Sequence, residues 1–236
     1  MHDTEQFEQE PFGVVNDYTN SFHAEADDPL LSALLARAQA EHVSVVTPNV
    51  ARLLEMLVTI REPRCILELG TAYGVSTYHM LKGLSAPARL VTLDLVAERQ
   101  QVAKEFLASE GMDAHDVRFV CADFREEGFL EKLAAEAGPF DFVFIDAAKG
   151  QYAHLLEQLA PHLSARGVVV FDNIFLNGWI VADRYPNHRQ KTAFLRMKAF
   201  LAAVRQDGRF APSLLPLDDG VLVLAKREEQ GYEPED

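Results

Sequence analysis

The stretch Cys65-Ile-Leu-Glu-Leu-Gly-Thr-Ala-Tyr-Gly-Val-Ser76 decides the fold expected for this chain. Its first five residues, Cys65–Leu69, are nearly all apolar, which is typical of a parallel strand buried on both faces. Gly70 and Gly74 then permit a tight turn and let a ligand approach the backbone closely. A helical pattern runs from Ser76 to Leu84, and the N–H groups at a helix N-terminus favour anionic atoms. A strand, a glycine turn and a helix in this order predict a nucleoside-binding α/β domain.

Short β-rich runs alternate with helical patterns along the rest of the chain. Further buried strands are expected at Leu90–Leu93, Val117–Cys121, Phe140–Ile145 and Gly167–Phe171. Helical patterns cover Pro29–Glu41, Pro48–Ile60, Ala97–Ser109, Gly128–Ala137, Gln151–Leu163 and Arg189–Val204. The segment Ser213–Lys226 has a turn at Asp218-Asp219-Gly220 between two apolar runs, which indicates a hairpin. We therefore predict an α/β fold with a doubly wound, mostly parallel, seven-stranded sheet and a C-terminal antiparallel hairpin.

One domain with a sizeable core is expected, because α/β folds of 236 residues often stay undivided and 48% of these residues are apolar. We place the domain at residues 29–227, between an acidic N-terminal arm at 1–28 and an acidic tail at 228–236. The two ends carry thirteen acidic residues and no Lys or Arg, so only −1 of the net charge of −14 belongs to the body between them. Acidic ends are usually solvated, and the net charge therefore excludes no class of partner.

The sequence also bears on the cellular compartment. Met1–Glu10 lacks the basic start and apolar run of a signal peptide, and no stretch approaches the ~20 apolar residues of a membrane helix. Cys65 and Cys121 each lie in a short apolar run, which indicates buried free thiols and disfavours a disulfide or a metal site. We predict a cytoplasmic protein that does not associate with a membrane.

Three carboxylates near the strand ends indicate the kind of ligand. Glu68 lies inside the strand before the glycine turn, where a carboxylate suits a ligand with an amino group. Asp94 ends the next strand and can accept hydrogen bonds from ribose hydroxyls, and Asp123 borders the same crevice. The turn lacks the full G-x-G-x-x-G spacing of a pyrophosphate binder, which disfavours a nicotinamide oxidoreductase. The structural alternative is that the glycines serve the crossover and the aspartates cap helices.

A second polar group follows the fourth and fifth strands. Asp146 ends one strand, and Asp172 and Asn173 end the other, so three oxygen ligands should meet in one crevice. Two carboxylates and an amide suit Mg²⁺ or a similar hard cation. Asp172 and Asn173 can share the cation only where the strand gives way to a loop, because adjacent strand residues point to opposite faces. Lys149 follows Asp146 closely enough to reach the same place. The alternatives are a helix cap, a turn and an ordinary surface lysine.

The stretch Glu68–Ser76 with Asp94 and Asp123 resembles the cofactor site of class I methyltransferases. The downstream sequence is similar to the metal-dependent subgroup that includes catechol and caffeoyl-CoA O-methyltransferases. This resemblance implies S-adenosylmethionine as cofactor, with Gly70 near its methionine portion, Asp94 at the ribose and Asp123 at the adenine edge. The residues implied to bind it are Val43, Glu68, Gly70, Thr71, Gly74, Ser76, Asp94, Leu95, Asp123, Phe124 and Asp146. Ala72 stands where the catechol enzyme has a tyrosine, so one side-chain contact is missing.

The resemblance also implies a reaction. The sulfonium methyl is already electrophilic, so the protein must supply an acceptor oxyanion in line with it. A divalent metal at Asp146, Asp172 and Asn173 would lower the pKa of the acceptor hydroxyl and select substrates with two neighbouring oxygens. Lys149 would remove the proton or stabilise the resulting anion. Asp146 and Lys149 are therefore the expected catalytic residues of an O-methyltransferase.

The sequence indicates the type of reaction more clearly than it indicates the acceptor. The run Asp146-Ala-Ala-Lys-Gly-Gln-Tyr152, with Val181–Phe200 and Leu215–Gly220, resembles the bacterial tRNA 5-hydroxyuridine methyltransferases. That resemblance implies methylation of the 5-hydroxyl of a wobble uridine, which lies beside the 4-carbonyl oxygen. A basic segment could contact phosphates: Arg184, Arg189, Lys191, Arg196, Lys198, Arg205 and Arg209. A solvated helix face is the alternative for these residues. Tyr185 and His188 could stack on a base, or could simply be exposed.

Two rival functions and one assembly stay open. A small-molecule methyltransferase of the catechol type would take a vicinal diol instead of tRNA. A nucleoside-binding regulatory module would use the same fold without catalysis, but it would not need Asp146, Lys149, Asp172 and Asn173 together. The N-terminal helices are expected to support a homodimer. The aromatic residues of the arm could fold over the acceptor mouth or a partner subunit: Phe7, Phe12, Tyr18 and Phe22.

Overall fold

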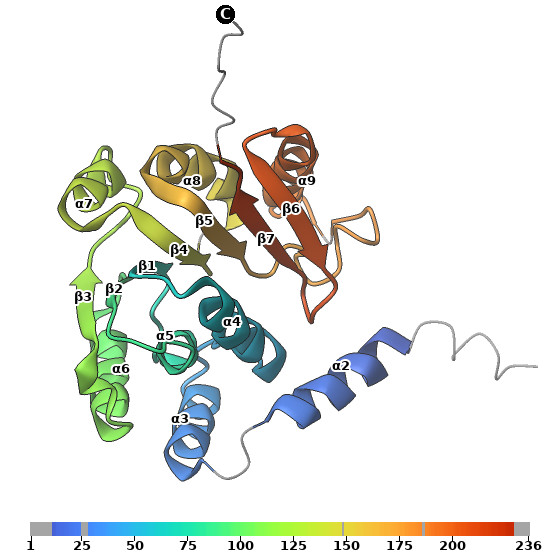
Figure 1. Ribbon diagram of the computed structural model, residues 1–236. Coiled ribbons are helices and arrows are strands. Elements are labelled where there is room, and N and C mark those ends of the chain that lie inside the picture. Colours follow the sequence, from blue (N-terminus) through green and yellow to red (C-terminus); the bar gives the residue numbers. More distant parts are fainter. Residues whose placement is uncertain (1–10, 25–27, 148, 186, 229–236) are drawn as a thin grey trace, which may run out of the picture.

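A computed structural model describes residues 11–24, 28–147, 149–185 and 187–228 (Figure 1). Within these residues, seven strands form one sheet in the order β3-β2-β1-β4-β5-β7-β6. The strands are β1 Cys65–Leu69, β2 Arg89–Asp94, β3 Asp116–Cys121, β4 Phe140–Ile145, β5 Leu163–Phe171, β6 Phe210–Leu215 and β7 Val221–Lys226. The first five are parallel, and β7 runs antiparallel to β5 and β6. The predicted seven-stranded, mostly parallel sheet with a C-terminal hairpin is confirmed.

The strand order creates one crevice. The chain builds β1, β2 and β3 outward in one direction and then returns to place β4 on the other side of β1. The direction of winding therefore reverses between β1 and β4, and ligands of open α/β sheets bind beyond the carboxyl ends of the strands at such a point. Leu69 pairs with Ile145 across the two strands, so their carboxyl ends lie level with each other.

Helices cover both faces of the sheet (Figure 1). One face carries α3 Pro29–Ala40, α4 Pro48–Arg61, α5 Val75–Lys82 and α6 Ala97–Ser109, and the other carries α7 Phe129–Ala137, α8 Tyr152–Leu159 and α9 Lys191–Gln206. Side chains of β4 alternate between the two cores, with Phe142 and Phe144 on the first side and Val143 and Ile145 on the second. Because both faces are buried, the strand is apolar except for Asp141, which is half-buried and pairs with Arg61.

The helix predicted at Gln151–Leu163 is shorter in the structure. A single turn of 3₁₀-helix, Lys149–Gln151, leads into α8, which ends at Leu159. A second 3₁₀ turn, Ala160–His162, follows and contains Pro161, which lacks the N–H group that an α-helix would need there. Strand β5 then begins at Leu163, four residues before the predicted start. The predicted strand, Gly167–Phe171, covers the part of β5 that pairs regularly with β4. The pairing register shifts between Phe140 and Phe142 of β4, before this part begins.

Strand β3 corrects the expectation that all the parallel strands are buried on both faces. It lies at the edge of the sheet, and all its residues are exposed or half-buried. Cys121 at its end is exposed, so the prediction of two buried thiols is wrong for this residue. Cys65 is buried as predicted, and burial raises the pKa of its thiol to about 11.

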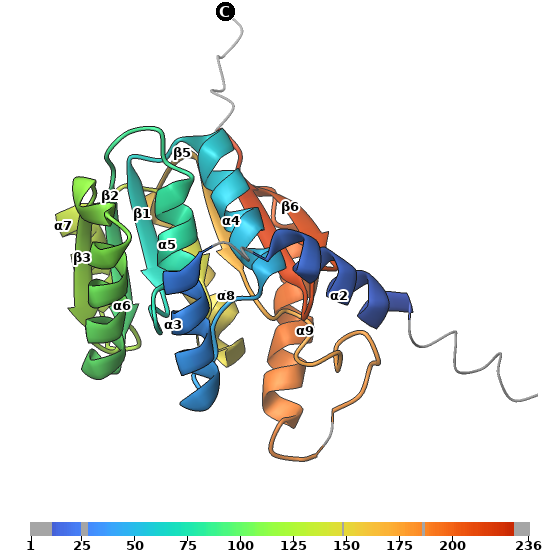
Figure 2. The same ribbon diagram turned by 90° about the horizontal axis from the view of Figure 1, so that it is seen from below.

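The predicted acidic arm contains a helix that belongs to the domain. Helix α2, Pro11–His23, packs against α4 (Figure 2). Asn20 Nδ2 donates to Asp218 Oδ1 at 2.7 Å, and Asn49 N donates to Asn20 Oδ1 at 3.0 Å. Polar contacts thus connect α2 to the N-terminal end of α4 and to the hairpin turn, and the folded part begins before residue 29.

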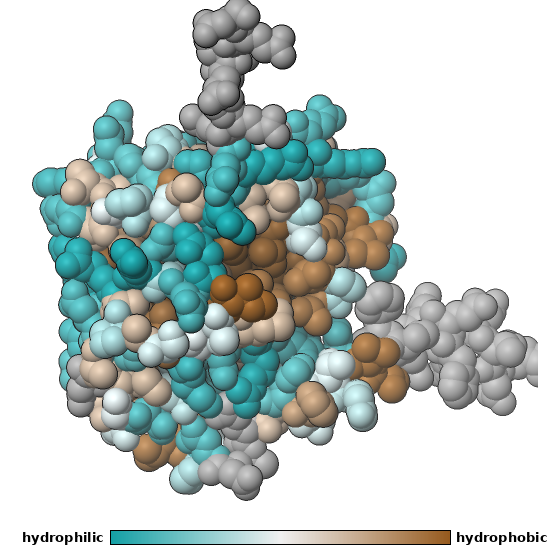
Figure 3. Space-filling model, in the orientation of Figure 1, coloured by the Kyte–Doolittle hydropathy of each residue, from teal (hydrophilic) through white to brown (hydrophobic). Residues whose placement is uncertain are grey.

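Of the four aromatic residues of the arm, the structure describes the side chains of two. The side chains of Tyr18 and Phe22 are exposed, whereas Phe7 and the side chain of Phe12 lie outside the described residues, as does the acidic tail from residue 229. Apolar side chains also gather on the face that α4 and β6 present, among them Met56, Ile60 and Leu214 (Figure 3). The homodimer stays a prediction. No described helix is long and apolar enough to cross a membrane.

Candidate active site

Gly70 allows the ends of β1 and β4 to meet. Its φ of +112° lies in the region that favours glycine, and its N–H donates to the carbonyl of Leu93 at 2.9 Å. A Cβ added at Gly70 would lie 2.4 Å from the backbone carbonyl oxygen of Asp146. Any side chain would therefore push apart the glycine turn and the strand end that carries Asp146.

Glu68 lies buried among hydroxyl groups, and its predicted contact with the cofactor stays a prediction. Its side chain has no exposed surface, and it accepts hydrogen bonds from the hydroxyls of Ser76 at 2.5 Å, Thr77 at 2.6 Å and Thr92 at 2.6 Å. Burial raises the pKa of this carboxyl to about 7 against the opposing effect of the hydroxyls. Glu68 fixes the first turn of α5 to β2 and orients the hydroxyl of Ser76, whose oxygen can still accept a hydrogen bond.

Thr71 has a similar structural role, and its predicted contact with the cofactor also stays a prediction. Its hydroxyl shares a hydrogen bond of 2.6 Å with that of Thr92 and accepts another from Gln100 at 3.2 Å. Its N–H donates to the carbonyl of Leu93, and its own carbonyl accepts from the N–H of Gly74. With these groups engaged and only 1% of the residue exposed, Thr71 holds the turn in shape.

Asp94 locks the same turn from β2. Its Oδ2 accepts from the N–H of Ala72 at 2.8 Å, and its Oδ1 accepts from the N–H of Val96 at 2.9 Å. Each carboxylate oxygen keeps capacity for one more donor, as the predicted contact with ribose hydroxyls requires. Leu95, directly after it, is 55% exposed at the carboxyl end of β2.

The remaining predicted cofactor residues surround this end of the sheet. Asp123 binds the guanidinium of Arg125 at 2.6 Å, and that hydrogen bond lowers the pKa of the Asp123 carboxyl. Phe124 is buried and Val43 is half-buried. Their contacts with a ligand stay predictions, as do those of Gly74, which takes φ +81° to begin α5 and whose added Cβ would meet Ala103 of α6 at 2.8 Å.

The predicted metal ligands and the predicted base come together at the ends of β4 and β5. Lys149 Nζ lies 3.9 Å from Asp146 Oδ1 and donates a hydrogen bond to Asn173 Oδ1. The N–H of Asn173 in turn donates to Asp172 Oδ1 at 2.7 Å. One ammonium group therefore lies among oxygen ligands from two strand ends, as the sequence indicated.

The backbone of Asn173 explains how neighbouring residues can serve one site. Strand β5 ends at Phe171, and Asn173 takes φ +56°, so the chain has left strand geometry between Asp172 and Asn173. The expectation that the strand must give way to a loop here agrees with this geometry. The Asp172 carbonyl accepts a hydrogen bond of 2.8 Å from the hydroxyl of Tyr152, which fixes the start of the loop.

Sequence reasoning assigned no part in the site to the hairpin turn. The N–H of Ile174 donates to the carbonyl of Gly220 at 2.9 Å, and that of Phe175 donates to the carbonyl of Asp219 at 2.7 Å. A Cβ at Gly220 would lie 2.6 Å from the ring of Phe175. The turn therefore supports the loop after Asn173, although its sequence was interpreted only as a signal for a hairpin and as part of the resemblance to the tRNA methyltransferases.

The two carboxyl groups of the site, Asp146 and Asp172, have raised pKa values. Burial raises the pKa of Asp146, and the charge of Lys149 opposes that shift. Burial, and next the charge of Asp146, raise the pKa of Asp172 to about 7. A buried carboxylate whose ionisation is disfavoured by a half-buried neighbour fits a cation held between the two, and carboxylate and amide oxygens suit a hard divalent ion. Among the described residues, no three His, Cys, Asp or Glu side chains are grouped so that they could hold a metal ion, and the set described here has two carboxylates and an amide.

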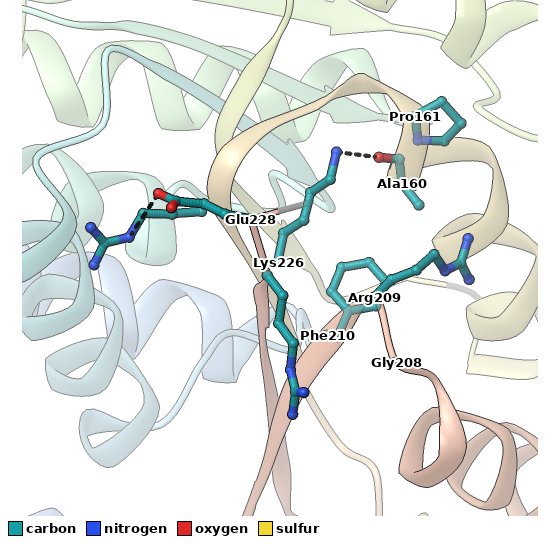
Figure 4. A pocket seen from close by; sticks show the side chains of 9 residues that line it. Ala160, Pro161, Gly208, Arg209, Phe210, Lys226 and Glu228 are labelled. Carbon is teal, nitrogen blue, oxygen red and sulfur yellow. Dashed lines mark hydrogen bonds and ion pairs between the residues drawn. The ribbon is translucent and has the colours of Figure 1, made fainter. Parts of the chain in front are cut away.

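A hollow of about 980 Å³ lies elsewhere and does not belong to this site (Figure 4). Ala160 and Arg166 line it near the amino end of β5. Arg209, directly before β6, and Lys226, the last residue of β7, also line it. Three of its four basic side chains have partners within the described residues, and the exception is Arg227; Arg166 lies 4.0 Å from Glu228. Lys226 Nζ donates to the carbonyls of Ala160 and Leu163, and Arg209 pairs with Glu157 and Asp207. The carboxyl ends of the strands are therefore the candidate site.

Known proteins provide an independent comparison. A family model described as O-methyltransferase matches residues 22–228. Two proteins named as O-methyltransferases, from Mycolicibacterium vanbaalenii and Mycobacterium avium, are 31% and 33% identical to the chain, and each alignment covers 86% of it and 87% and 90% of the respective relative. The crystal structure of the Bacillus cereus O-methyltransferase in complex with SAH has a TM-score of 0.74 at 25% identity, covering 90% of this chain and 97% of that one. A Staphylococcus aureus protein named as a caffeoyl-CoA O-methyltransferase shares the fold, with a TM-score of 0.77 at 22% identity and coverage of 90% and 99%.

Proposed function

The chain belongs to the O-methyltransferase family and is an enzyme that transfers a methyl group from S-adenosylmethionine to an oxygen atom. From this premise we propose that a divalent cation holds the acceptor through two neighbouring oxygens. The observation that carries the proposal is the meeting of Asp146, Asn173 and Lys149 beside Asp172. Family membership disfavours the rival of a non-catalytic regulatory module. The matching share of the chain includes all of these residues.

Asp146, Asp172 and Asn173 would hold the cation, with Mg²⁺ as the ion that their oxygens suit best. When bound there, the cation lowers the pKa of an acceptor hydroxyl and leaves positions open for a second acceptor oxygen. S-adenosylmethionine, bound at the Gly70 turn, supplies an electrophilic methyl group.

The protein's own groups position and deprotonate the acceptor. In its neutral amine form, Lys149 Nζ would take the proton of the acceptor hydroxyl and become an ammonium group, which would then stabilise the oxyanion that remains. Asn173, held in its left-handed conformation by the loop, keeps the amide oxygen on the side of Asp146. Gly70 brings the cofactor turn against the Asp146 backbone, which sets donor and acceptor sites next to each other.

The affinity for the cation is expected to rise with pH up to about 7. The pKa of Asp172 is raised to about 7, so below that pH the folded protein holds a proton that a cation must displace. Below pH 7 the apparent association constant for Mg²⁺ should increase up to about 10-fold per pH unit and then level off. Isothermal titration calorimetry with Mg²⁺ at pH 5.5, 6.5, 7.5 and 8.5 measures this. An affinity that is the same at pH 5.5 and 7.5 would contradict the assignment of Asp172 as a ligand.

Replacing Lys149 with Met is expected to lower kcat roughly 10²-fold or more, because a positioned proton acceptor contributes about that much. Met keeps most of the apolar stem and removes the ammonium group that contacts Asp146 and Asn173. The Kd for S-adenosylmethionine should stay within about twofold of the wild-type value. Lys198→Met is a matched control, because Lys198 is a surface lysine paired with Asp183. A Lys149→Met enzyme as fast as wild type would end the assignment of the base.

For the acceptor, we propose the 5-hydroxyl of 5-hydroxyuridine at the tRNA wobble position. The sequence run Asp146–Tyr152 supports this proposal, as do four exposed basic residues that have no ion pair within the described chain, Arg184, Arg189, Lys191 and Arg196. Arg205 lies on the face of α9 opposite Arg196 and is assigned no contact. In the structure Lys198 pairs with Asp183, and Arg209 pairs with Asp207 and Glu157, so these two offer less free charge. Tyr185 packs against the ring of Phe194 at 5.6 Å, whereas His188 is exposed.

One incubation tests the acceptor. The protein is mixed with labelled S-adenosylmethionine, Mg²⁺ and total tRNA from a strain that lacks it, and the digested nucleosides are analysed for label. A catechol serves as the competing small acceptor in a parallel reaction. Label in 5-methoxyuridine, with a rate that falls steeply as salt rises, is the expected result. Methylation of the catechol alone, insensitive to salt, would favour a small vicinal diol as the substrate.

A further inference from the structure

A hollow of about 620 Å³ opens directly beside Lys149, between α8 and α9. The turn that leads into α8 lines one side of it, through Lys149, Gly150 and Gln151. The other side is one face of α9, with Arg196, Ala199, Phe200 and Ala203. These four positions are three and four residues apart, so their side chains share one helix face. The hollow therefore continues from the proposed acceptor site over the surface of the domain.

Cations surround this groove and no acid lines it. Its charged or ionisable lining residues are Arg125, Lys149, His154 and Arg196, and none of the lining residues is Asp or Glu. Asp123 offsets the charge of Arg125, and Asp146 lies 3.9 Å from Lys149. A cation held by Asp146 and Asp172 would balance the charge of these carboxylates. The positive charge of Lys149 would then be available to a ligand in the groove. The groove thus presents basic side chains, and no carboxylate, at the edge of the reacting site.

Arg196 is the free charge of the groove. Within the described chain its guanidinium makes no hydrogen bond and no ion pair, unlike Lys198 and Arg209 on the same segment. A Cβ added at Gly150 would lie 3.8 Å from Arg196 Nη1, so the guanidinium lies over the turn that follows Lys149. An arginine in this position can form two parallel hydrogen bonds with phosphate oxygens.

The floor of the groove is made of small side chains. Ala153, Ala199 and Ala203, together with Gly150, leave the space between the two helices open, and Phe200 and Tyr152 lie buried beneath them. Such a shape admits an extended chain that carries phosphate groups, with apolar surface available to the atoms between them.

We propose that this groove binds a phosphate group of the acceptor, with Arg196 as the principal contact. The inference rests on the proposed function, because it assigns a second attachment point to a substrate whose reacting oxygens lie at the cation. A phosphate-bearing acceptor is then bound at both ends, and a small diol without phosphate uses the cation site alone. The phosphate belongs either to an RNA backbone or to a coenzyme A thioester, and the two sources offer the same chemistry to Arg196.

Arg196→Ala is the variant that tests the groove, and Arg205→Ala is its matched control. The two arginines are nine residues apart on α9, which at 3.6 residues per turn places Arg205 on the opposite face. Both are exposed, and both substitutions remove one positive charge. Three acceptors are compared: an RNA hairpin with 5-hydroxyuridine in its loop, a coenzyme A thioester of a dihydroxy aromatic acid, and the free dihydroxy acid.

Arg196→Ala should raise the Kd and KM of a phosphate-bearing acceptor about 10-fold and leave kcat unchanged. The kcat and KM for the free acid should also stay unchanged. The slope of log K for binding of the phosphate-bearing acceptor against log salt concentration should become smaller by about one. Arg205→Ala should change each value less than about twofold. An effect on the RNA alone, or on the thioester alone, identifies the source of the phosphate. If both variants behave alike towards every acceptor that wild type uses, the groove proposal is overturned and the cation chemistry stands. If wild type methylates only the free acid and binds neither phosphate-bearing probe, the groove and the RNA acceptor both fail.

Discussion

Asp172→Asn is expected to lower kcat roughly 10³-fold or more and, at the same time, to make the metal-free protein more stable above pH 7. The loss of activity follows from removing one carboxylate of the proposed cation site. The gain in stability follows from burial, because only 4% of Asp172 is exposed and its ionised form lies near Asp146. Asn keeps the oxygen that accepts from the N–H of Asn173.

The pH dependence of this stability gain has a definite sign. The pKa of Asp172 is about 7 in the folded protein and near 3.8 when exposed. Between these values the folded state binds the extra proton, so this group's contribution makes wild-type stability fall as pH rises. The Asn variant lacks that loss. Its advantage should be near zero below pH 4, grow towards pH 7 and stay constant above, on the order of 1–3 kcal/mol.

Three measurements separate these effects. Thermal unfolding of the metal-free proteins at pH 5 and 8 should show the advantage, at about 2–4 °C per kcal/mol for a protein of this size. Adding Mg²⁺ should raise the Tm of wild type and leave that of Asp172→Asn unchanged. Binding of S-adenosylmethionine should persist in the variant. Equal loss of cofactor affinity, or normal activity, would contradict the division between a cation site and a cofactor site.

Gly70→Ala is expected to abolish cofactor binding and to cost about 3 kcal/mol or more of folding free energy. Two effects combine. The φ of +112° is one that L-residues avoid, and the added Cβ would lie 2.4 Å from the Asp146 carbonyl oxygen. Because that oxygen belongs to the backbone of β4, relief requires the two strand ends to separate, which also displaces the proposed cation ligand.

Gly111→Ala provides the control for backbone conformation alone. Gly111 has φ +72°, and a Cβ there would meet nothing within 4 Å. This variant should lose only about 1 kcal/mol and keep full affinity for S-adenosylmethionine. Urea unfolding and calorimetry of both variants measure the difference. If Gly70→Ala lost no more stability than Gly111→Ala and still bound the cofactor, the close approach of β1 and β4 would not be required.

Local sequence pattern predicted several elements with their observed bounds. Cys65–Leu69, Ala97–Ser109 and Phe140–Ile145 form a strand, a helix and a strand at the predicted residues. These segments have a clear apolar period, and few competing signals lie at their ends. The helix predicted to Leu163 stopped at Leu159 because Pro161 changes the local geometry. Cys121 was placed wrongly because an apolar run does not reveal that its strand lies at a sheet edge.

The grouping of Asp146, Asp172 and Asn173 was also within reach of the sequence. Parallel strands deliver their carboxyl ends to one edge, so strand order and a general rule of α/β folds were enough to bring these side chains together. The rule gives no contacts, however. It could not show that Lys149 lies between Asp146 and Asn173, or that the hairpin turn supports the loop that follows.

The sequence by itself determined the fold class, the position of the glycine turn and the set of strand-end polar residues, because these follow from the order of residues within short segments. The tertiary structure alone decided that Glu68 is enclosed by Ser76, Thr77 and Thr92, and that Arg196 lies over the turn after Lys149. Each of these arrangements joins elements far apart in the chain. Their geometry depends on how helices pack on the sheet, to within a few ångströms, and periodicity along a segment carries no information about that packing.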